Sequence, residues 1–129
     1  MDNKEFALKY AEAQKKAWQG DFDALEQLES PDIIIHYPPA GDFKGFEAHK
    51  QFIMAGRETT TGLQQEWDYI TGDGNVCVLS QKETLTTKAE IPIWKVPAGA
   101  TISADGLFVL RLENGRIVEM WIKASVATE

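Results

Sequence analysis

The sequence predicts a single α+β domain spanning residues 1–129, in which three N-terminal helices pack on a curved antiparallel sheet and enclose a pocket. Two observations lead to this fold class. Segments with the period of an amphipathic helix dominate the first half, whereas the second half consists of strand-like runs separated by turns. The dipeptide Asn114-Gly115 between the last two runs is a strong hairpin signal. A chain of 129 residues suits one domain with one core.

Two helices open the chain. Residues 4–19 carry apolar side chains at intervals of three and four, and Gly20 ends this pattern. Asp21 can cap a second helix, which stops at Ser30-Pro31 because the residue before a proline disfavours the helical region. The apolar faces contain Phe6, Tyr10, Ala13 and Ala17 in the first helix, and Phe22, Leu25 and Leu28 in the second.

One strand, a third helix and four further strands follow. The β-branched run at 33–37 predicts the first strand, and the Pro-Pro-Ala-Gly sequence at 38–41 breaks it. A helix is expected from Gly45 to about Thr60. The later strands are expected at 63–71, 76–88, 101–112 and 116–126, with a proline-containing loop at 91–99. Helices on one face of a long curved sheet leave a cavity between the layers, where a small ligand would bind.

Composition narrows the range of partners. The formal net charge is −7 and the sequence has no Lys/Arg cluster, which argues against nucleic acid. No stretch approaches the roughly 18 apolar residues of a membrane span, and the N-terminus lacks the apolar core of a signal peptide. The single cysteine, Cys77, lies in a predicted buried strand and cannot form an intrachain disulfide, so we expect a soluble cytoplasmic protein.

Four segments resemble a known family. Residues 18–25 (Trp-Gln-Gly-Asp-Phe-Asp-Ala-Leu) are similar to the junction of the first two helices in NTF2-like proteins, and residues 44–48 (Lys-Gly-Phe-Glu-Ala) to their third-helix entry. Residues 35–38 (Ile-His-Tyr-Pro) resemble the strand-end His-x-Pro of the SnoaL-like branch. Residues 108–121 (Phe-Val-Leu-Arg-Leu-Glu-Asn-Gly-Arg-Ile-Val-Glu-Met-Trp) resemble the closing hairpin. The chain thus resembles the SnoaL-like polyketide cyclase branch of the NTF2-like superfamily, least well at 88–104.

This resemblance implies an NTF2-like (cystatin-like) cone, often assembled as a homodimer through the sheet. Members of the family include polyketide cyclases, ketosteroid isomerase, dehydratases, epoxide hydrolases and many proteins that are not enzymes. The fold alone therefore leaves the reaction open.

Positions that carry the chemistry of relatives hold other residues here. The acid/base aspartate of SnoaL-like cyclases matches Ile122, and the strand-end aspartate of ketosteroid isomerase matches Tyr37. The oxyanion-hole tyrosine and aspartate of that isomerase match Ala13 and Phe108. A carboxylate base and a two-donor oxyanion hole are absent from their usual places, which argues against both mechanisms.

Three residues are candidates for catalysis. His36 lies at a strand end beside the Pro-Pro break and is expected to line the pocket, where an imidazole could move a proton near neutral pH; the alternative is a histidine that merely orients the loop. Asp68 lies in the strand at 63–71 and faces either a cavity or solvent. Tyr10 lies on the buried stripe of the first helix, where its hydroxyl needs a partner in the pocket or in the core.

The pocket walls are predicted from strand alternation and from the aromatic residues. His49, on the third helix, is expected to be a partly buried structural histidine. No metal site is expected, because the two histidines lie far apart without a nearby carboxylate pattern. The residues expected to bind the substrate are Trp18, Tyr37, Trp67, Phe108, Met120 and Ile122, with packing or a dimer contact as the alternative for Tyr37.

The sequence favours a small-molecule enzyme that needs no cofactor, a cyclase, isomerase or dehydratase (lyase) acting on a hydrophobic, carbonyl-bearing substrate. His36 would shuttle the proton, while Asp68 or Tyr10 orients it or the substrate. The alternative is a non-catalytic protein of the same fold that binds a hydrophobic ligand or only dimerises. We expect a homodimer through the outer sheet face, with Trp121 and Ile117 contributing apolar area.

Overall fold

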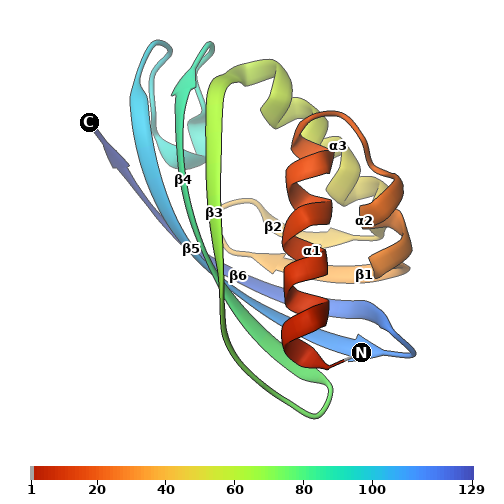
Figure 1. The fold of residues 1–129 in the computed structure, drawn as a ribbon. Coiled ribbons are helices and arrows are strands. Elements are labelled where there is room, and N and C mark those ends of the chain that lie inside the picture. Colours follow the sequence, from red (N-terminus) through yellow and green to blue (C-terminus); the bar gives the residue numbers. More distant parts are fainter. Residues whose placement is uncertain (1) are drawn as a thin grey trace.

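The computed structural model describes residues 2–129 as three helices packed on one side of a six-stranded sheet (Figure 1). This arrangement confirms the predicted α+β class and cone-like fold. The helices are α1 (Asn3–Trp18), α2 (Asp23–Leu28) and α3 (Phe46–Thr59), with a short 3-10 helix η1 (Pro92–Trp94). The strands are β1 (Glu29–Tyr37), β2 (Gly41–Lys44), β3 (Thr60–Asp73), β4 (Val76–Thr87), β5 (Thr101–Glu113) and β6 (Arg116–Thr128).

The sheet is mixed, with the strand order β2-β1-β6-β5-β4-β3. Every pairing is antiparallel except that of β1 with β6, which is parallel, so the expectation of a wholly antiparallel sheet was wrong for this pair. The chain leaves β1 through β2 and α3 before it returns as β3 to β6, so no hairpin connects β1 with β6 and forces them to be antiparallel. Strand β2 forms where the sequence indicated only a break.

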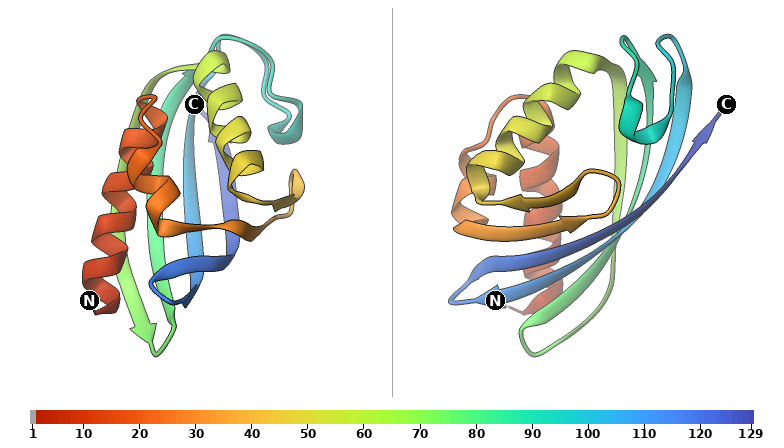
Figure 2. Two further views of the ribbon diagram at one scale, coloured as in Figure 1. Left: turned by 90° about the vertical axis from the view of Figure 1, so that its right-hand side faces the viewer. Right: turned by 180° about the vertical axis from the view of Figure 1, so that it is seen from behind.

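Strands β3 to β6 are long and curve strongly, and the sheet remains open (Figure 2). The helices cover the concave face, with α1 lying along β3 and β4 and α3 crossing near β1. Twisted strands of this length diverge from straight helices toward their far end. The curvature therefore brings the layers together at one end and separates them at the other.

Strand β1 starts at Glu29, immediately after α2, rather than at residue 33 as the sequence indicated. The segment Ser30-Pro31 lies inside this strand, at the irregularity in its pairing with β6 between Glu29 and Ile34. A proline is tolerated in a strand where the ladder is already interrupted. The predicted cap Asp21 lies one residue before the actual N-cap of α2, although its Oδ1 accepts the Asp23 N–H at 3.1 Å.

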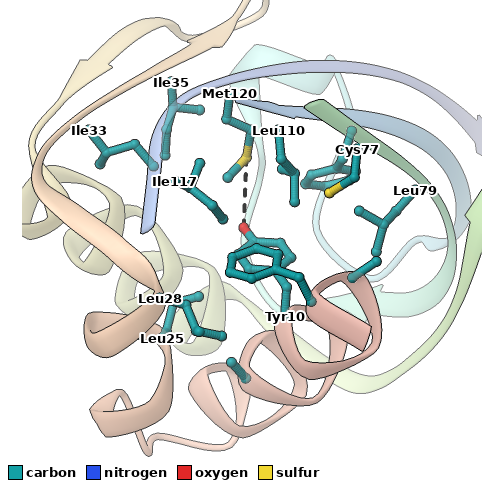
Figure 3. Packing of buried hydrophobic residues seen from close by; sticks show 14 of the residues in the cluster. Tyr10, Leu25, Leu28, Ile33, Ile35, Cys77, Leu79, Leu110, Ile117 and Met120 are labelled. Atoms are coloured by element: carbon teal, nitrogen blue, oxygen red, sulfur yellow. Dashed lines mark hydrogen bonds between the residues drawn. The ribbon is translucent and has the colours of Figure 1, made fainter. Parts of the chain in front are cut away.

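The main core lies where α1 and α2 meet the sheet, and Figure 3 shows several of its residues around Tyr10. Tyr10, Leu110 and Met120 are all fully buried there. A smaller cluster around Leu85, Val96 and Ile102 fills the far end of the sheet. Among residues 2–129, no helix has the length and apolar character that a membrane crossing requires.

Candidate active site

A cavity of about 330 Å³ lies between the two clusters, bounded by α3, the end of α1, the concave face of the sheet and the segment that contains η1. This segment lies beside the C-terminal end of α3, where the Lys88 N–H donates to the Thr59 carbonyl at 2.7 Å (Figure 2). The aromatic walls are Trp18, Tyr37, Phe52, Trp94 and Phe108. The volume is typical of sites for small organic molecules.

The cavity exists because small residues occupy inward positions on two adjacent strands. Ala104 and Gly106 on β5, and Ala124 on β6, all line the cavity, and Gly106 pairs directly with Ala124. Successive side chains of a strand point to opposite faces, so these small residues leave a hollow in the inner face. A Cβ built on Gly106 would lie 3.1 Å from the Phe108 ring, so even this small addition would tighten the wall.

Two close contacts position the aromatic walls. The Trp94 Nε1–H donates to the Tyr37 hydroxyl at 2.7 Å, which connects η1 to β1 at the cavity wall. The Trp18 ring lies directly against Gly56 of α3, where a Cβ would come within 2.4 Å of the ring. Glycine at position 56 therefore allows the indole to pack against the helix backbone and form part of the wall.

Glu29 and His49 form a buried pair at the cavity. The His49 Nδ1 lies 2.8 Å from the Glu29 Oε1, and the two side chains are 5% and 0% exposed. His49 also lines the cavity from α3, whereas Glu29 approaches it from the first position of β1. A carboxylate at this position accepts the Nδ1–H and fixes the tautomer in which Nε2 carries the lone pair. Among residues 2–129, no side chain or backbone group is hydrogen-bonded to that Nε2.

Tyr10 and Gln14 extend this pair into a buried polar network. The Tyr10 hydroxyl donates to the Glu29 Oε2 at 3.3 Å and accepts the Gln14 Nε2–H at 2.7 Å. Burial, together with the negative charge of Glu29, raises the pKa of Tyr10 well above its ordinary value, so the phenol remains a neutral donor. Both oxygens of Glu29 are thus hydrogen-bonded, which allows a carboxylate to persist without water.

A second polar region lies on the sheet side of the cavity. Gln81 and Glu83 line it from β4, and the Gln65 Nε2–H donates to the Glu83 Oε2 at 3.3 Å. Burial raises the pKa of Glu83, and the hydrogen bond from Gln65 opposes this shift. The described residues that line the cavity include no lysine and no arginine. The cavity wall is therefore mostly apolar, and its polar groups are His49, acidic side chains and neutral side chains.

Four of the residues predicted to bind substrate do line this cavity: Trp18, Tyr37, Phe108 and Ile122. His36 does not, and the expectation that it faces the pocket was wrong. Buried Ile35 and Tyr37 point inward from β1, so His36 between them points to the outer face of the sheet.

His36 belongs to a charged network on that outer face. Its Nε2 lies 2.7 Å from the Glu119 Oε2, its Nδ1 lies 3.1 Å from the Asp42 Oδ1, and its ring stacks on Trp121 at 5.4 Å. The hydrogen bond with Glu119 raises the pKa of His36, and Asp42 contributes in the same direction. The same bond lowers the pKa of Glu119, with Arg111 as a further favourable partner.

Asp68 and Tyr10 also lie outside the cavity wall. Asp68 is exposed on β3 and points away from the inner face, which corresponds to the solvated alternative. Tyr10 is fully buried in the core, where its hydroxyl contacts Glu29 and also approaches the Met120 Sδ at 3.7 Å (Figure 3). It reaches the site only through the hydrogen bonds of the buried network.

Trp67 and Met120 face inward but lie beneath the cavity rather than on its wall. Trp67 packs edge-on against Tyr10 at 6.2 Å and against Phe108 at 4.9 Å, and its buried Nε1 has no partner among residues 2–129. Met120 is fully buried in the core. The expectation that these two residues line the pocket was wrong, because α1 covers their end of the sheet.

Ile117 was expected on the outer face of the sheet, and this expectation was also wrong, because Ile117 is fully buried. The pairing of β5 with β6 shifts between Arg111 and Leu112, which leaves Val118 without an opposite residue. Such a bulge turns Ile117 to the same face as Met120. Strand alternation read from the sequence does not include this extra residue.

The pair that the sequence did not identify, Glu29 and His49, lies 20 residues apart in the chain. The sequence pattern places Glu29 at the end of a predicted helix and indicates only a structural role for His49. In the sequence, the position of His49 between Phe46 and Phe52 was the one indication that its side chain faces the interior from α3.

In the described part of the chain, no group of three or more His, Cys, Asp or Glu residues could hold a metal ion.

The profile of the SnoaL-like domain family matches residues 9–120, and the chain belongs to this family. TsrD from Streptomyces laurentii is 18% identical, with a TM-score of 0.81 over 97% of this chain and 92% of that one. IdmH from Streptomyces antibioticus, a proposed polyketide cyclase, is 22% identical, with a TM-score of 0.77 over 97% and 93%.

AclR from Streptomyces galilaeus, a proposed hydroxylase, is 21% identical, with a TM-score of 0.73 over 95% of this chain and 88% of that one. These identities support a shared fold and not a shared reaction. A comparison with curated protein sequences gives no significant match.

Proposed function

We propose that this protein is a small-molecule enzyme that needs no cofactor and transfers a proton on a hydrophobic, carbonyl-bearing substrate, as a cyclase, isomerase or dehydratase does. One observation carries this proposal. The buried Glu29 carboxylate lies 2.8 Å from the His49 Nδ1, and His49 forms part of the wall of an apolar cavity. An imidazole oriented by a carboxylate is a common general base.

The chemistry follows from the tautomer that Glu29 selects. The lone pair on the His49 Nε2 takes a proton from the carbon next to the substrate carbonyl, and the C–H electron pair forms the C=C bond of an enolate while the carbonyl π pair moves to oxygen. The imidazolium remains paired with Glu29. Return of the proton to a different carbon gives an isomer, and its transfer to a departing hydroxyl gives dehydration. Attack of the enolate carbon on a second carbonyl closes a ring: the π pair of that carbonyl moves to its oxygen, and the His49 imidazolium returns its proton to the alkoxide.

The apolar walls contribute by excluding water. Trp18, Phe52 and Phe108 line the same cavity as His49, and the small residues of β5 and β6 leave room for the substrate. In such surroundings the attraction between imidazolium and carboxylate is stronger than in water. A substrate held in one orientation also needs less reorganisation to react.

Deuterium exchange into 2-tetralone, an apolar bicyclic ketone, tests this proposal without knowledge of the natural substrate. Proton NMR in deuterium oxide follows the loss of the signal from the carbon beside the carbonyl. His49→Ala should slow the exchange catalysed by the protein by about a hundredfold, the usual contribution of a general base. His36→Ala, the matched histidine on the outer face, should leave the rate unchanged. Equal rates for the wild type and His49→Ala would refute the proposal.

The second candidate is a protein that binds an apolar ligand without converting it. The observation in its favour is that Ile122 and Phe108, where relatives carry acid/base or oxyanion-hole groups, are apolar and line the cavity. Quenching of tryptophan fluorescence by 2-tetralone, with no exchange above the rate in buffer, would support this alternative.

A homodimer through the outer sheet face is also part of the proposal. Ile34, Leu107 and Trp121 lie on that face and are 37%, 43% and 40% exposed. Exposed apolar side chains gathered on one face are typical of a surface that contacts another protein. Light scattering at micromolar concentration should give the mass of two chains, and a monomer would contradict it.

A further inference from the structure

Two polar side chains stand apart from the Glu29–His49 pair on the cavity wall, Tyr37 on β1 and Glu83 on β4. The Tyr37 hydroxyl accepts the Trp94 Nε1–H at 2.7 Å, so its own O–H remains free to donate. Glu83 receives the Gln65 amide on Oε2, so its Oε1 is left without a protein partner among residues 2–129. Neither side chain takes part in the mechanism described above.

A substrate carbonyl in this cavity needs hydrogen-bond donors that the Glu29–His49 pair cannot supply. His49 donates its Nδ1–H to Glu29 and presents an acceptor at Nε2. The Thr59 and Thr60 hydroxyls, which also line the cavity, donate to backbone carbonyls of α3. An enolate oxygen would therefore be unsupported beside His49 unless other cavity residues donate to it.

We propose that Tyr37 and Glu83 form a two-donor site that binds the carbonyl oxygen of the substrate and selects a neutral, oxygen-bearing molecule. This inference rests on the proposed function, because it assigns the electrophilic half of the same cavity. The donors differ from those of relatives, whose oxyanion-hole positions match Ala13 and Phe108. Here one donor comes from β1 and the other from β4.

The electrostatic surroundings are consistent with two neutral donors. Burial raises the pKa of Glu83, and no lysine or arginine among residues 2–129 forms an ion pair with it. Burial also raises the pKa of Tyr37, the hydrogen bond from Trp94 lowers it, and the charge of an ionised Glu83 would raise it further. A protonated carboxyl can donate a hydrogen bond where a carboxylate cannot.

The charge of the remaining wall leads to the same selectivity. The other titratable groups on the cavity wall are Glu90 and His49, while the residues paired with Glu83 on β3 and β5 are Gln65 and Ala104. A ligand with a carboxylate would meet acidic side chains and no cation. A neutral ketone avoids that repulsion and gains two hydrogen bonds to its oxygen.

Infrared spectroscopy of bound 2-tetralone, labelled with carbon-13 at the carbonyl, tests this site. Two donated hydrogen bonds should move the C=O band of the bound ketone to lower wavenumber than that of the ketone in buffer or in hexane. Tyr37→Phe and Glu83→Leu should each reverse part of the shift and weaken binding about tenfold, a typical effect of one lost hydrogen bond in a closed site. Glu83→Gln keeps a donor at the same place and should retain the shift.

Three controls make the outcome specific. Glu66→Leu removes an exposed carboxylate from the neighbouring strand and should change neither the band nor the affinity. Gln81→Leu removes the wall amide that lies on the same strand as Glu83, and loss of the shift in this variant alone would overturn the proposal. As pH rises and Glu83 ionises, the wild type should bind the ketone more weakly, whereas Glu83→Gln should not.

The result separates this inference from the proposed function. A band that is shifted in the wild type and restored in Tyr37→Phe and Glu83→Leu supports the two-donor site, even if no deuterium exchange occurs. An unshifted band, or one that is insensitive to both substitutions, overturns the site even if His49 catalyses exchange. Tighter binding of 2-naphthoate, an anion of similar shape, than of 2-tetralone would also overturn it.

Discussion

Replacing Ala104 by leucine tests whether small residues hold the cavity open. Ala104 is 7% exposed and lines the cavity of about 330 Å³ from the middle of the sheet. Leucine adds three carbon atoms, each worth about 0.8 kcal/mol when buried, and loses up to about 1 kcal/mol of side-chain entropy. We expect the free energy of unfolding to rise by about 1.5 kcal/mol, or the melting temperature by about 5 °C.

The same substitution should abolish ligand binding, because the added side chain occupies the site. Urea denaturation measures the first effect, and quenching of tryptophan fluorescence by 2-tetralone measures the second. Ala127→Leu is the matched control, since Ala127 is exposed on β6 and should change neither quantity by more than about 0.5 kcal/mol. Lower stability together with intact binding would mean that the space beside Ala104 is already filled, and would refute this account of the cavity.

Three further predictions concern other parts of the chain. The raised pKa of His36 should return toward its ordinary value in Glu119→Gln when measured by NMR titration, and an unchanged titration would contradict this pairing. The pair stabilises the fold between the lowered pKa of Glu119 and the raised pKa of His36, and this stabilisation is lost as pH rises through the pKa of His36. Burial raises the pKa of the Cys77 thiol to about 11. A disulfide reagent at neutral pH should therefore label Cys77 only as fast as the protein unfolds, and rapid labelling of the folded protein would argue against this burial. Gly56→Ala should lower the free energy of unfolding by about 1–3 kcal/mol, because the added Cβ would lie 2.4 Å from the Trp18 ring. A higher free energy of unfolding in urea denaturation would show that the ring can move away freely.

The architecture was largely accessible from the sequence because it depends on local patterns. The spacing of apolar residues in α1 and the turn at Asn114-Gly115 each specify a local structure that the fold retains. The parallel pairing of β1 with β6 was not accessible, because it joins segments that no hairpin connects. Strand β2 is only four residues long, and its Gly41 looked like part of a chain break.

The candidate site was harder to predict because it depends on which face each strand residue occupies. Inward and outward residues alternate regularly from Ile33 to Tyr37 on β1. Either His36 or Tyr37 could be the inward residue, and the choice depends on knowing that Ile33 and Ile35 are buried. On β6, the bulge at Val118 interrupts the alternation. A shift of one residue inverts every assignment on a strand, so family position alone placed His36 on the wrong face.

The pairing of Glu29 with His49 could not be derived from spacing. The two residues come from different elements, and a glutamate at the end of an apparent helix usually faces solvent. The cavity itself had a signal, since Ala104, Gly106 and Ala124 are small residues at alternating inward positions of adjacent strands. That pattern becomes informative once the register of β5 and β6 is known.

The most direct test of the central claim is a double-mutant cycle on Glu29 and His49, with deuterium exchange into 2-tetralone as the readout. If Glu29 acts by orienting His49, Glu29→Gln should slow exchange, and combining it with His49→Ala should give a rate no lower than that of His49→Ala alone. Circular dichroism of each variant should confirm that the fold is kept. Rate losses that multiply in the double variant, or a Glu29→Gln protein as active as the wild type, would contradict the claim that this pair works as one base.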